Sequence, residues 1–338
     1  MHIQKNTPLD HLNTFGLKSY ASFFTEVRSI QELSDIIVNP DWKETPKFIL
    51  GGGSNILLLN NIEALVIHLQ IKGIEKVKED EKHVWIHAGG GEIWHDFVMF
   101  CVENGYAGIE NLSLIPGTVG AAPMQNIGAY GVEIKEVVET VEAVSLATGQ
   151  SRSFSWIECK FGYRESIFKH ELKGQYVITG VTFRMNKVPD FKVAYGDIKN
   201  TLASMGVTTY SIKAISEAVI NIRKSKLPDP AEIGNAGSFF KNPEISKKQY
   251  GDLQGSFPLI PGYDTGADLV KVPAGWLIEQ AGWKGFREGP VGVHEKQALV
   301  LVNYGEGTGQ QIKSLSERIQ DSVEKRFGIR LSAEVNFV

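Results

Sequence analysis

Residues 115–131, of sequence IPGTVGAAPMQNIGAYG, most strongly limit what this chain can fold into. Glycine and alanine break helical and strand periodicity here, so we expect a segment too irregular for either element. Small residues also let backbone N–H and C=O groups reach a ligand, and Gln125 and Asn126 add donors and acceptors suited to a planar heterocycle. The alternative is a tight buried loop in which the glycines serve only packing.

A second glycine-rich loop, GGGSN at residues 51–55, lies between two short apolar runs that we expect to be buried strands. A Rossmann fingerprint needs its glycines between a strand and a helix, and a Walker loop needs Gly-Lys-Ser/Thr. Neither pattern is present, so the loop is predicted to join strand to strand. Its N–H groups and the Ser54 hydroxyl could form an anion-binding nest, although the same residues also suit an ordinary turn.

Length and charge restrict the partners of the chain. Its 338 residues predict two or three domains. A formal net charge of -4 without a long basic run disfavours binding to nucleic acid or to a membrane surface, which leaves small molecules. The N-terminus lacks an apolar signal core and no stretch is long enough to cross a bilayer, so we expect a cytoplasmic protein.

The cysteines and histidines suggest no redox or metal centre. Cys101 and Cys159 lie far apart in sequence, and Cys101 belongs to the apolar stripe of an expected helix, where it reads as a core residue. The histidines are scattered; His83 and His87 flank a strand-like run at an offset that keeps them apart on one face. We therefore expect no metal site.

Helical and strand patterns alternate along the chain and predict an α+β fold. Ser29 and Glu32 form an expected capping box, Thr308 and Gly328 are expected to bound a long helix, and prolines after residue 227 suggest a domain boundary. The other expected helices are residues 92–103, 213–224 and 273–282, and the other expected strands are residues 85–88, 140–146, 176–184 and 331–337.

Three polar residues are candidates for chemistry. Ser238 stands between small residues and two phenylalanines, which can place its hydroxyl in a partly dry pocket, although it could equally be a turn residue. Arg164 lies among aromatic and apolar neighbours, where a guanidinium favours a planar anionic partner. Glu334 falls opposite the apolar face of the closing strand, so on its own it reads as a solvated carboxylate.

Six motifs taken together resemble the UDP-N-acetylenolpyruvoylglucosamine reductase family, in its order and over essentially the whole chain. They are GGGSN at 51–55, IPGTVG at 115–120, QNIGAYG at 125–131, GYRES at 162–166, GSFFKNP at 237–243 and AGWLIEQ at 274–280.

The resemblance implies an α+β fold with a two-part FAD-binding domain of the vanillyl-alcohol oxidase type and a C-terminal α/β substrate-binding domain. The implied divisions are residues 1–68 with 328–338 for the first FAD-binding subdomain, 69–227 for the second, and 228–327 for the UDP-sugar-binding domain. The C-terminal strand would thus return to the first subdomain and carry Glu334 to the site.

The resemblance also assigns residues to the site, with Arg164, Ser238 and Glu334 as the catalytic residues. FAD, bound non-covalently because neither loop holds a histidine, would contact Gly51, Gly52, Gly53, Ser54, Asn55, Ile115, Pro116, Gly117, Gly120, Gln125, Asn126, Gly128, Ala129 and Tyr130. The UDP-sugar would contact Tyr195, Lys226, Asn242, Tyr263, Lys284 and Gln297, with Tyr195 on the mobile loop of one family branch.

The implied reaction has two halves. NADPH reduces FAD, and hydride then passes to C3 of the enolpyruvyl group of UDP-N-acetylenolpyruvoylglucosamine to give UDP-N-acetylmuramate, a precursor of peptidoglycan. In the family, the residues matching Arg164 and Glu334 serve the substrate carboxylate, and the residue matching Ser238 delivers a proton to C2. A monomer is implied.

Two other functions remain open. An oxidase on the same flavin domain would pass electrons from a reduced sugar or alcohol to oxygen. A nucleotide-sugar sensor would keep the pocket and bind FAD but consume no NADPH.

Overall fold

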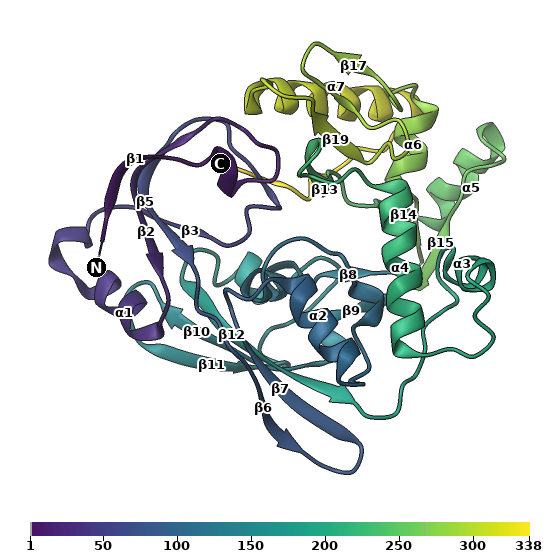
Figure 1. Ribbon diagram of the computed structural model, residues 1–338. Coiled ribbons are helices and arrows are strands. Elements are labelled where there is room, and N and C mark those ends of the chain that lie inside the picture. The colour runs from purple at the N-terminus through teal and green to yellow at the C-terminus, as the bar shows by residue number, and fades with distance from the viewer. Residues whose placement is uncertain (1, 267) are drawn as a thin grey trace. The chain divides into compact units, whose positions relative to one another are not determined.

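The computed structural model describes residues 2–266 and 268–338 and divides them into two compact units (Figure 1). Unit 1 consists of the N-terminal residues through Thr7, Ala21–Gly52 and Glu63–Ser225. Unit 2 consists of Pro8–Tyr20, Gly53–Ile62 and Lys226–Val338. Both units mix helices with strands, which confirms the predicted α+β class.

Unit 1 is built on two sheets. The four-stranded sheet has the order β1 (Gln4–Pro8), β2 (Tyr20–Val27), β5 (Ile62–Leu69) and β3 (Lys47–Leu50), with β3 and β5 parallel. The antiparallel five-stranded sheet has the order β11 (Ser151–Ser155), β10 (Val138–Ser145), β12 (Tyr176–Asn186), β7 (His83–Gly89) and β6 (Ile74–Glu79). A short hairpin pairs β8 (Gly128–Ala129) with β9 (Val132–Glu133).

Each face of the five-stranded sheet packs on a different core. One face, with Ile86 and Val181, joins Phe97 of α2 (Trp94–Glu103) in the larger core. Val144 and Val177 instead join the core formed with α1 (Ile30–Val38) and the four-stranded sheet. The regions predicted as two FAD-binding subdomains thus share a core within unit 1, and their three-part division with residues 228–327 stays a prediction.

Two further helices of unit 1 carry a small core of their own. α3 (Ile198–Ser204) and α4 (Ile212–Lys226) pack through Ile198, Leu202, Ile215 and Val219. The last residue of α4, Lys226, belongs to unit 2. Short 3-10 helices span Asp10–Leu12, Pro40–Trp42, Glu110–Leu112, Val119–Gln125, Ile134–Glu136 and Ile167–Lys169; the first of them belongs to unit 2.

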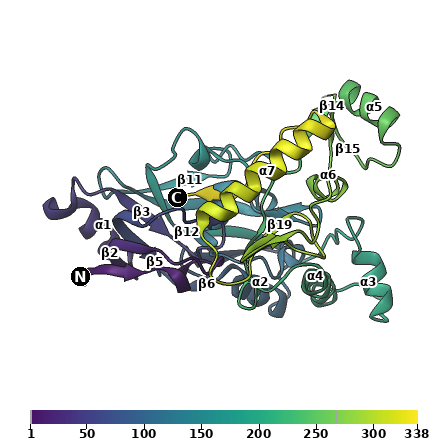
Figure 2. The same ribbon diagram turned by 90° about the horizontal axis from the view of Figure 1, so that it is seen from above.

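Unit 2 contains antiparallel sheets and three helices. One sheet has the order β13 (Gly234–Ser238), β19 (Val300–Asn303), β18 (Val291–Val293) and β17 (Arg287–Glu288), and the other β14 (Glu244–Ser246), β16 (Leu269–Lys271) and β15 (Tyr263–Gly266). The helices are α5 (Lys247–Ser256), α6 (Ala274–Gln280) and α7 (Gly309–Phe327), and α7 packs on β18, β19 and α6 (Figure 2).

The C-terminal strand pairs with a strand from the first part of the sequence, and both strands belong to unit 2. β20 (Asn336–Phe337) pairs in parallel with β4 (Ile56–Leu57), the strand that follows the triple-glycine loop. The predicted strand 331–337 is shorter than expected, because upstream of β20 only an isolated bridge between Ala333 and Phe240 continues the pairing.

Two local predictions need correction. Residues 115–131 are not wholly irregular, because Val119–Gln125 forms a 3-10 helix that ends at Asn126 in the left-handed region. At α1, Ser29 accepts a hydrogen bond from the N–H of Glu32, but the Glu32 carboxylate accepts from the N–H of Arg28 rather than of Ser29, so the capping box is not reciprocal. The capping box of Thr308 with Gln311 is complete and opens α7, which ends at Gly328 as predicted.

Candidate active site

The two glycine-rich loops meet within unit 1. A Cβ atom placed on Gly52 would lie 2.9 Å from Cα of Gly117, and one on Gly51 would lie 2.8 Å from the Thr118 hydroxyl oxygen. The backbones therefore approach more closely than any side chain allows. The paired loops present peptide groups rather than side chains where they meet. Such a surface fits the diphosphate and polar ring edge of a flavin dinucleotide.

The remainder of the triple-glycine loop belongs to unit 2. There it contacts residues 12–14, a segment that sequence analysis did not single out. Gly53 has φ +61°, and a Cβ there would lie 2.0 Å from the Leu12 carbonyl oxygen. The Thr14 N–H donates to the Gly53 carbonyl at 3.1 Å. Buried Asn13 shapes this segment, because its amide donates to the carbonyls of Leu9 and Leu17 and accepts from the Leu17 N–H.

Arg164 lies against the loop predicted to line the flavin. It occupies a tight turn closed by reciprocal backbone hydrogen bonds between Gly162 and Glu165, and its φ of +56° is unusual for a residue with a side chain. Its guanidinium donates to the carbonyl of Gly128. Strained backbone of this kind persists where the surroundings hold it and is often functional.

Asn126, a predicted flavin contact, is engaged by the protein. Its buried amide donates to the Glu133 carboxylate and to the Gly162 carbonyl, both at 2.9 Å, and accepts from the Lys135 N–H at 3.1 Å. The side chain therefore connects the loop predicted to line the flavin, residues 125–130, to the turn that carries Arg164. Gln125, Ala129 and Tyr130 lie partly buried on the same loop.

Ser238 and Glu334 come together in unit 2 through backbone pairing. The Glu334 N–H donates to the carbonyl of Phe239 at 2.8 Å, and the Lys241 N–H donates to the carbonyl of Ser332 at 2.9 Å. The amide of Asn55 donates to the Glu334 carbonyl at 3.3 Å. Two predicted catalytic residues and one cofactor-loop residue thus share one neighbourhood.

An irregularity in β13 sets the direction of Ser238. The register with β19 shifts between Asn235 and Ser238, and Gly237 N–H donates to the side chain of buried Asn235 at 2.9 Å. Such a bulge turns the following side chain. Ser238 is exposed, in contrast to the partly dry pocket expected, because it ends an edge strand while Phe239 turns into the core.

The predicted UDP-sugar residues fall in both units. Tyr195 lies in unit 1, whereas the other five belong to unit 2. Three of those five lie beside α6: the Asn242 side chain accepts from the Ala274 N–H at 2.9 Å, Lys284 pairs with Glu279 at 3.0 Å, and a Cβ on Gly275 would lie 3.1 Å from Oε1 of Gln297. Exposed Lys226 ends α4, and exposed Tyr263 begins β15.

Sequence analysis did not identify two polar residues near the loop predicted to line the flavin, buried Asn111 and half-buried Arg223. Asn111, 1% exposed, donates to the carbonyls of Tyr130 and Lys192. Arg223 of α4 donates from Nε to the Leu114 carbonyl at 3.2 Å. Burial raises the pKa of the Tyr130 hydroxyl, and the Arg223 charge partly offsets this. Neither residue belongs to a motif, so no sequence signal marks it.

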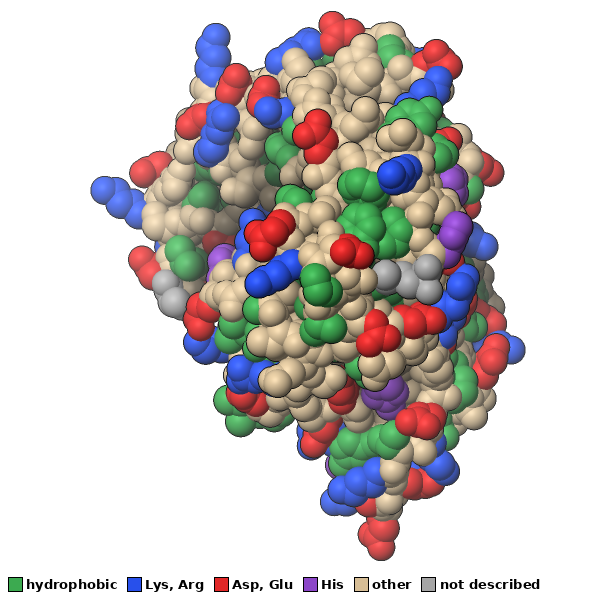
Figure 3. Space-filling view, turned by 90° about the vertical axis from the view of Figure 1, so that its left-hand side faces the viewer, with side chains coloured by type: hydrophobic (Ala, Val, Ile, Leu, Met, Phe, Trp, Pro, Cys, Tyr) green, Lys and Arg blue, Asp and Glu red, His purple; other side chains and the backbone are tan. Residues whose placement is uncertain are grey.

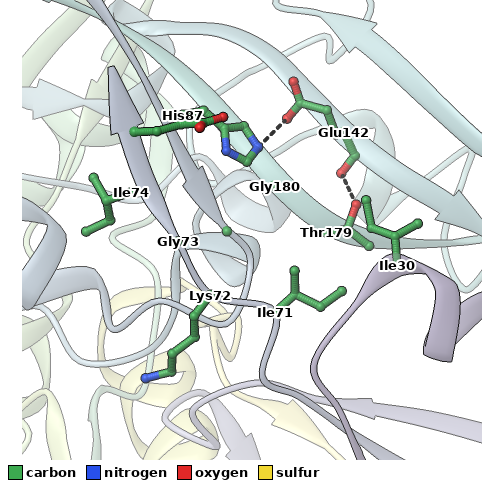
Figure 4. A pocket seen from close by; sticks show the side chains of 11 residues that line it. Ile30, Ile71, Lys72, Gly73, Ile74, His87, Glu142, Thr179 and Gly180 are labelled. Carbon is green, nitrogen blue, oxygen red and sulfur yellow. Dashed lines mark hydrogen bonds and ion pairs between the residues drawn. The ribbon is translucent and has the colours of Figure 1, made fainter. Parts of the chain in front are cut away.

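A cavity of about 350 Å³ in unit 1 holds none of the predicted site residues (Figure 4). His87 faces Glu142 across it, with Nε2 and Oε2 3.8 Å apart, and the Thr179 hydroxyl donates to the Glu142 carbonyl. Ile86 and Ala88 lie on the face of β7 opposite to that of His87, and they belong to the same core as Val119. The sheet therefore separates this cavity from the flavin loop.

Comparison with known proteins agrees with the motifs. An FAD binding domain model matches residues 21–155, and a model described as the UDP-N-acetylenolpyruvoylglucosamine reductase C-terminal domain matches residues 229–338. The reductases of that name from Amoebophilus asiaticus (strain 5a2) and Flavobacterium johnsoniae are 52% and 50% identical to this chain, and each comparison covers 100% of both proteins.

The fold agrees as well. The crystal structure of UDP-N-acetylenolpyruvylglucosamine reductase from Thermus caldophilus matches with a TM-score of 0.69 at 24% identity, over 100% of this chain and 99% of that one. With full-length identities near one half, the chain belongs to the UDP-N-acetylenolpyruvoylglucosamine reductase family.

Proposed function

We propose that Arg164, Ser238 and Glu334 carry out the reduction for which this family is named. The chain is a flavin-dependent oxidoreductase that uses FAD and NADPH to convert UDP-N-acetylenolpyruvoylglucosamine into UDP-N-acetylmuramate, a step in the synthesis of peptidoglycan precursors. The backbone pairing of Phe239 with Glu334 is the main support for the residue assignment, since it brings Glu334 beside the residue that follows Ser238 although the two lie far apart in sequence.

FAD would be held by the two glycine-rich loops. The side-chain-free backbone at Gly51, Gly52 and Gly117 suits the diphosphate, and the loop from Gln125 to Tyr130 would line the ring. When bound, FAD accepts hydride from NADPH and supplies it to C3 of the enolpyruvyl group. Asn126 would act by holding the loop, since its amide is engaged by protein partners.

Arg164 and Glu334 would act on the substrate carboxylate. Attack at C3 places negative charge on C2 and on the carboxylate of the substrate, so a positioned guanidinium lowers the barrier. Arg164 is suited to this because its turn and its bond to Gly128 restrict its orientation before the substrate arrives. Glu334 would accompany it at the same carboxylate.

Ser238 would deliver the proton to C2. A serine hydroxyl is a weak acid, so the basicity of the enolate and a fixed geometry must drive the transfer. The bulge in β13 supports this role, because it gives Ser238 a defined direction while Phe239 anchors the chain in the core.

The UDP-sugar would contact Tyr195, Lys226, Asn242, Tyr263, Lys284 and Gln297. Two lysines suit a diphosphate, and α6 gives Asn242, Lys284 and Gln297 a common support in unit 2. We also propose the domain division given by the resemblance, with residues 228–327 as the UDP-sugar-binding domain.

The setting proposed for the enzyme is a monomer in the cytoplasm, where it supports cell wall biogenesis and through it cell shape, the cell cycle and cell division. No helix among residues 2–266 and 268–338 is long and apolar enough to span a membrane. Basic and acidic side chains are intermixed on the face seen in Figure 3, a pattern that favours neither nucleic acid nor an anionic surface as partner.

A steady-state assay separates the reductase from its two rivals. The reductase consumes NADPH only when UDP-N-acetylenolpyruvoylglucosamine is added, and it forms UDP-N-acetylmuramate without hydrogen peroxide. An oxidase would generate peroxide from a reduced substrate. A nucleotide-sugar sensor would bind FAD and the UDP-sugar yet leave NADPH unconsumed, and either result would refute the proposed function.

A further inference from the structure

Asn111 is a buried amide that joins two loops of unit 1. Its Nδ2 donates to the carbonyl of Tyr130 at 3.0 Å, 19 residues away, and to the carbonyl of Lys192 at 2.7 Å, 81 residues away. The residue is 1% exposed. Leaving the donors of a buried amide unpaired is costly, so both bonds favour one arrangement of the two loops.

The two loops that Asn111 joins also touch each other. We call residues 191–196 the Tyr195 loop and residues 128–131 the Tyr130 turn. A Cβ on Gly131 would lie 3.3 Å from Cβ of Tyr195, and a Cβ on Gly196 would lie 3.5 Å from the Tyr130 ring. Tyr195 is therefore seated directly on the Tyr130 turn.

The Tyr195 loop has a second support on its other side. Phe191 and Val193 pack against the core of α3 and α4, and the ring centroids of Phe191 and Tyr210 lie 6.4 Å apart. These contacts hold the apolar side of the loop, whereas Asn111 is the polar group that joins it to the Tyr130 turn.

We propose that Asn111 is a positioning residue that sets the Tyr195 loop against the flavin loop and so tunes binding of the UDP-sugar. The inference rests on the proposed function, in which Tyr195 contacts the UDP-sugar and Tyr130 lines the flavin. The Asn111 carboxamide supplies two N–H donors, whereas a serine side chain supplies one O–H donor and an ionised aspartate supplies none. Asn111 acts through Tyr195 and touches no reacting atom.

The main test replaces Asn111 by aspartate, which keeps the shape and removes the donors. With the full chain loaded with FAD, we expect KM for UDP-N-acetylenolpyruvoylglucosamine to rise by about tenfold, while anaerobic reduction of the flavin by NADPH keeps its wild-type rate. Asn111→Ser, which keeps one donor, should give an intermediate KM. It replaces the aspartate variant in this test if that variant folds poorly. An unchanged KM in both variants would overturn the inference.

The matched control is Ser113→Ala, in the same segment. Ser113 bonds Glu110 and Ser216 at 2.7 and 2.8 Å but neither loop carbonyl. We expect it to lower stability without changing KM. If Ser113→Ala raises KM as much as Asn111→Asp, Asn111 has only a general structural role and the proposal fails.

A double-mutant cycle tests the route through Tyr195. In a Tyr195→Ala background, Asn111→Asp should raise KM little further, because the loop it positions has lost its contact. Fully additive effects would contradict the proposal. Wild-type chain without substrate-dependent NADPH consumption refutes the proposed function, and Tyr195→Ala without effect refutes the assignment of Tyr195. An effect of Tyr195→Ala alone, with a normal KM in Asn111→Asp, refutes only the positioning role.

Discussion

The Glu334 N–H donates a 2.8 Å hydrogen bond to the carbonyl of Phe239, the residue that follows Ser238. This bond joins two predicted catalytic positions that a linear reading of the chain cannot bring together. The carbonyl of Glu334 also accepts from Asn55, next to the triple-glycine loop. The proposed proton donor, the proposed carboxylate and the predicted cofactor loop therefore lie near one another within unit 2.

Replacing Ser238 by alanine should separate the two halves of the reaction. Because the hydroxyl is proposed to act only in proton delivery to C2, flavin reduction by NADPH should keep its wild-type rate. Reoxidation by UDP-N-acetylenolpyruvoylglucosamine should slow by about 10²- to 10⁴-fold, the range for loss of a general acid. Rapid-mixing absorbance of the flavin measures both rates. Equal slowing of the two halves would count against this assignment.

Replacing Arg164 by lysine should keep the charge but lose the planar fork that suits a carboxylate. We expect the oxidative half-reaction to fall by about 10²-fold, as for loss of one donor at a developing charge. The flavin spectrum and reduction by NADPH should stay normal. Single-turnover absorbance checks both, and a fully active Arg164→Lys enzyme would show that the guanidinium geometry is not needed.

Replacing Gly52 by alanine should weaken FAD binding. The new Cβ would lie 2.9 Å from Cα of Gly117, so the two loops must separate. Flavin content per polypeptide after dialysis measures the loss. Gly251→Ala on α5 is the control, because nothing lies within 4 Å of its Cβ position, and we expect full flavin content and a stability gain of up to about 1 kcal/mol. Equal flavin content in both variants would contradict the packing account.

The stability of the protein should depend on the ionisation of His95. Burial lowers the pKa of His95, whose Nδ1 accepts from the Leu114 N–H at 3.0 Å. The pKa of His95 in the folded protein lies below the unfolded value of about 6.5. The contribution of neutral His95 to the free energy of unfolding is therefore fully present above that pH and is lost as the pH falls through the folded pKa.

His95→Asn keeps an acceptor but cannot ionise, so its stability should fall less steeply below about pH 6.5. Urea unfolding of both proteins at several pH values measures this. The slope does not vanish, because burial also lowers the pKa of His294, which both proteins retain. Identical profiles for the two proteins would exclude His95 as a source of acid sensitivity.

Local signals predicted the regular elements well. α7 runs from the Thr308 cap to Gly328, because its apolar period and both end signals agree, and α4 was predicted to within two residues at each end. The 3-10 helix of Val119–Gln125 was missed because glycine, alanine and proline there give no amphipathic period. The Glu32 carboxylate accepts from the Arg28 N–H, and the residue spacing that defines a capping box could not predict this choice of partner.

The sequence predicted candidate site residues only through the resemblance to a known family, and their roles stay predictions. Arg164 and Ser238 stand inside recognisable motifs, whereas Glu334 was assigned from its place in the closing strand. Asn111 was not predictable, because its role arises from hydrogen bonds to partners 19 and 81 residues away. The same holds for Asn13, whose side-chain hydrogen bonds shape the segment that meets Gly53.

The most direct test of the account is an anaerobic flavin titration of the purified wild-type protein. One equivalent of NADPH should bleach the bound FAD, and UDP-N-acetylenolpyruvoylglucosamine should then restore the oxidised spectrum with formation of an equal amount of UDP-N-acetylmuramate. A flavin that NADPH leaves yellow, or one that oxygen reoxidises but this substrate does not, would contradict the account.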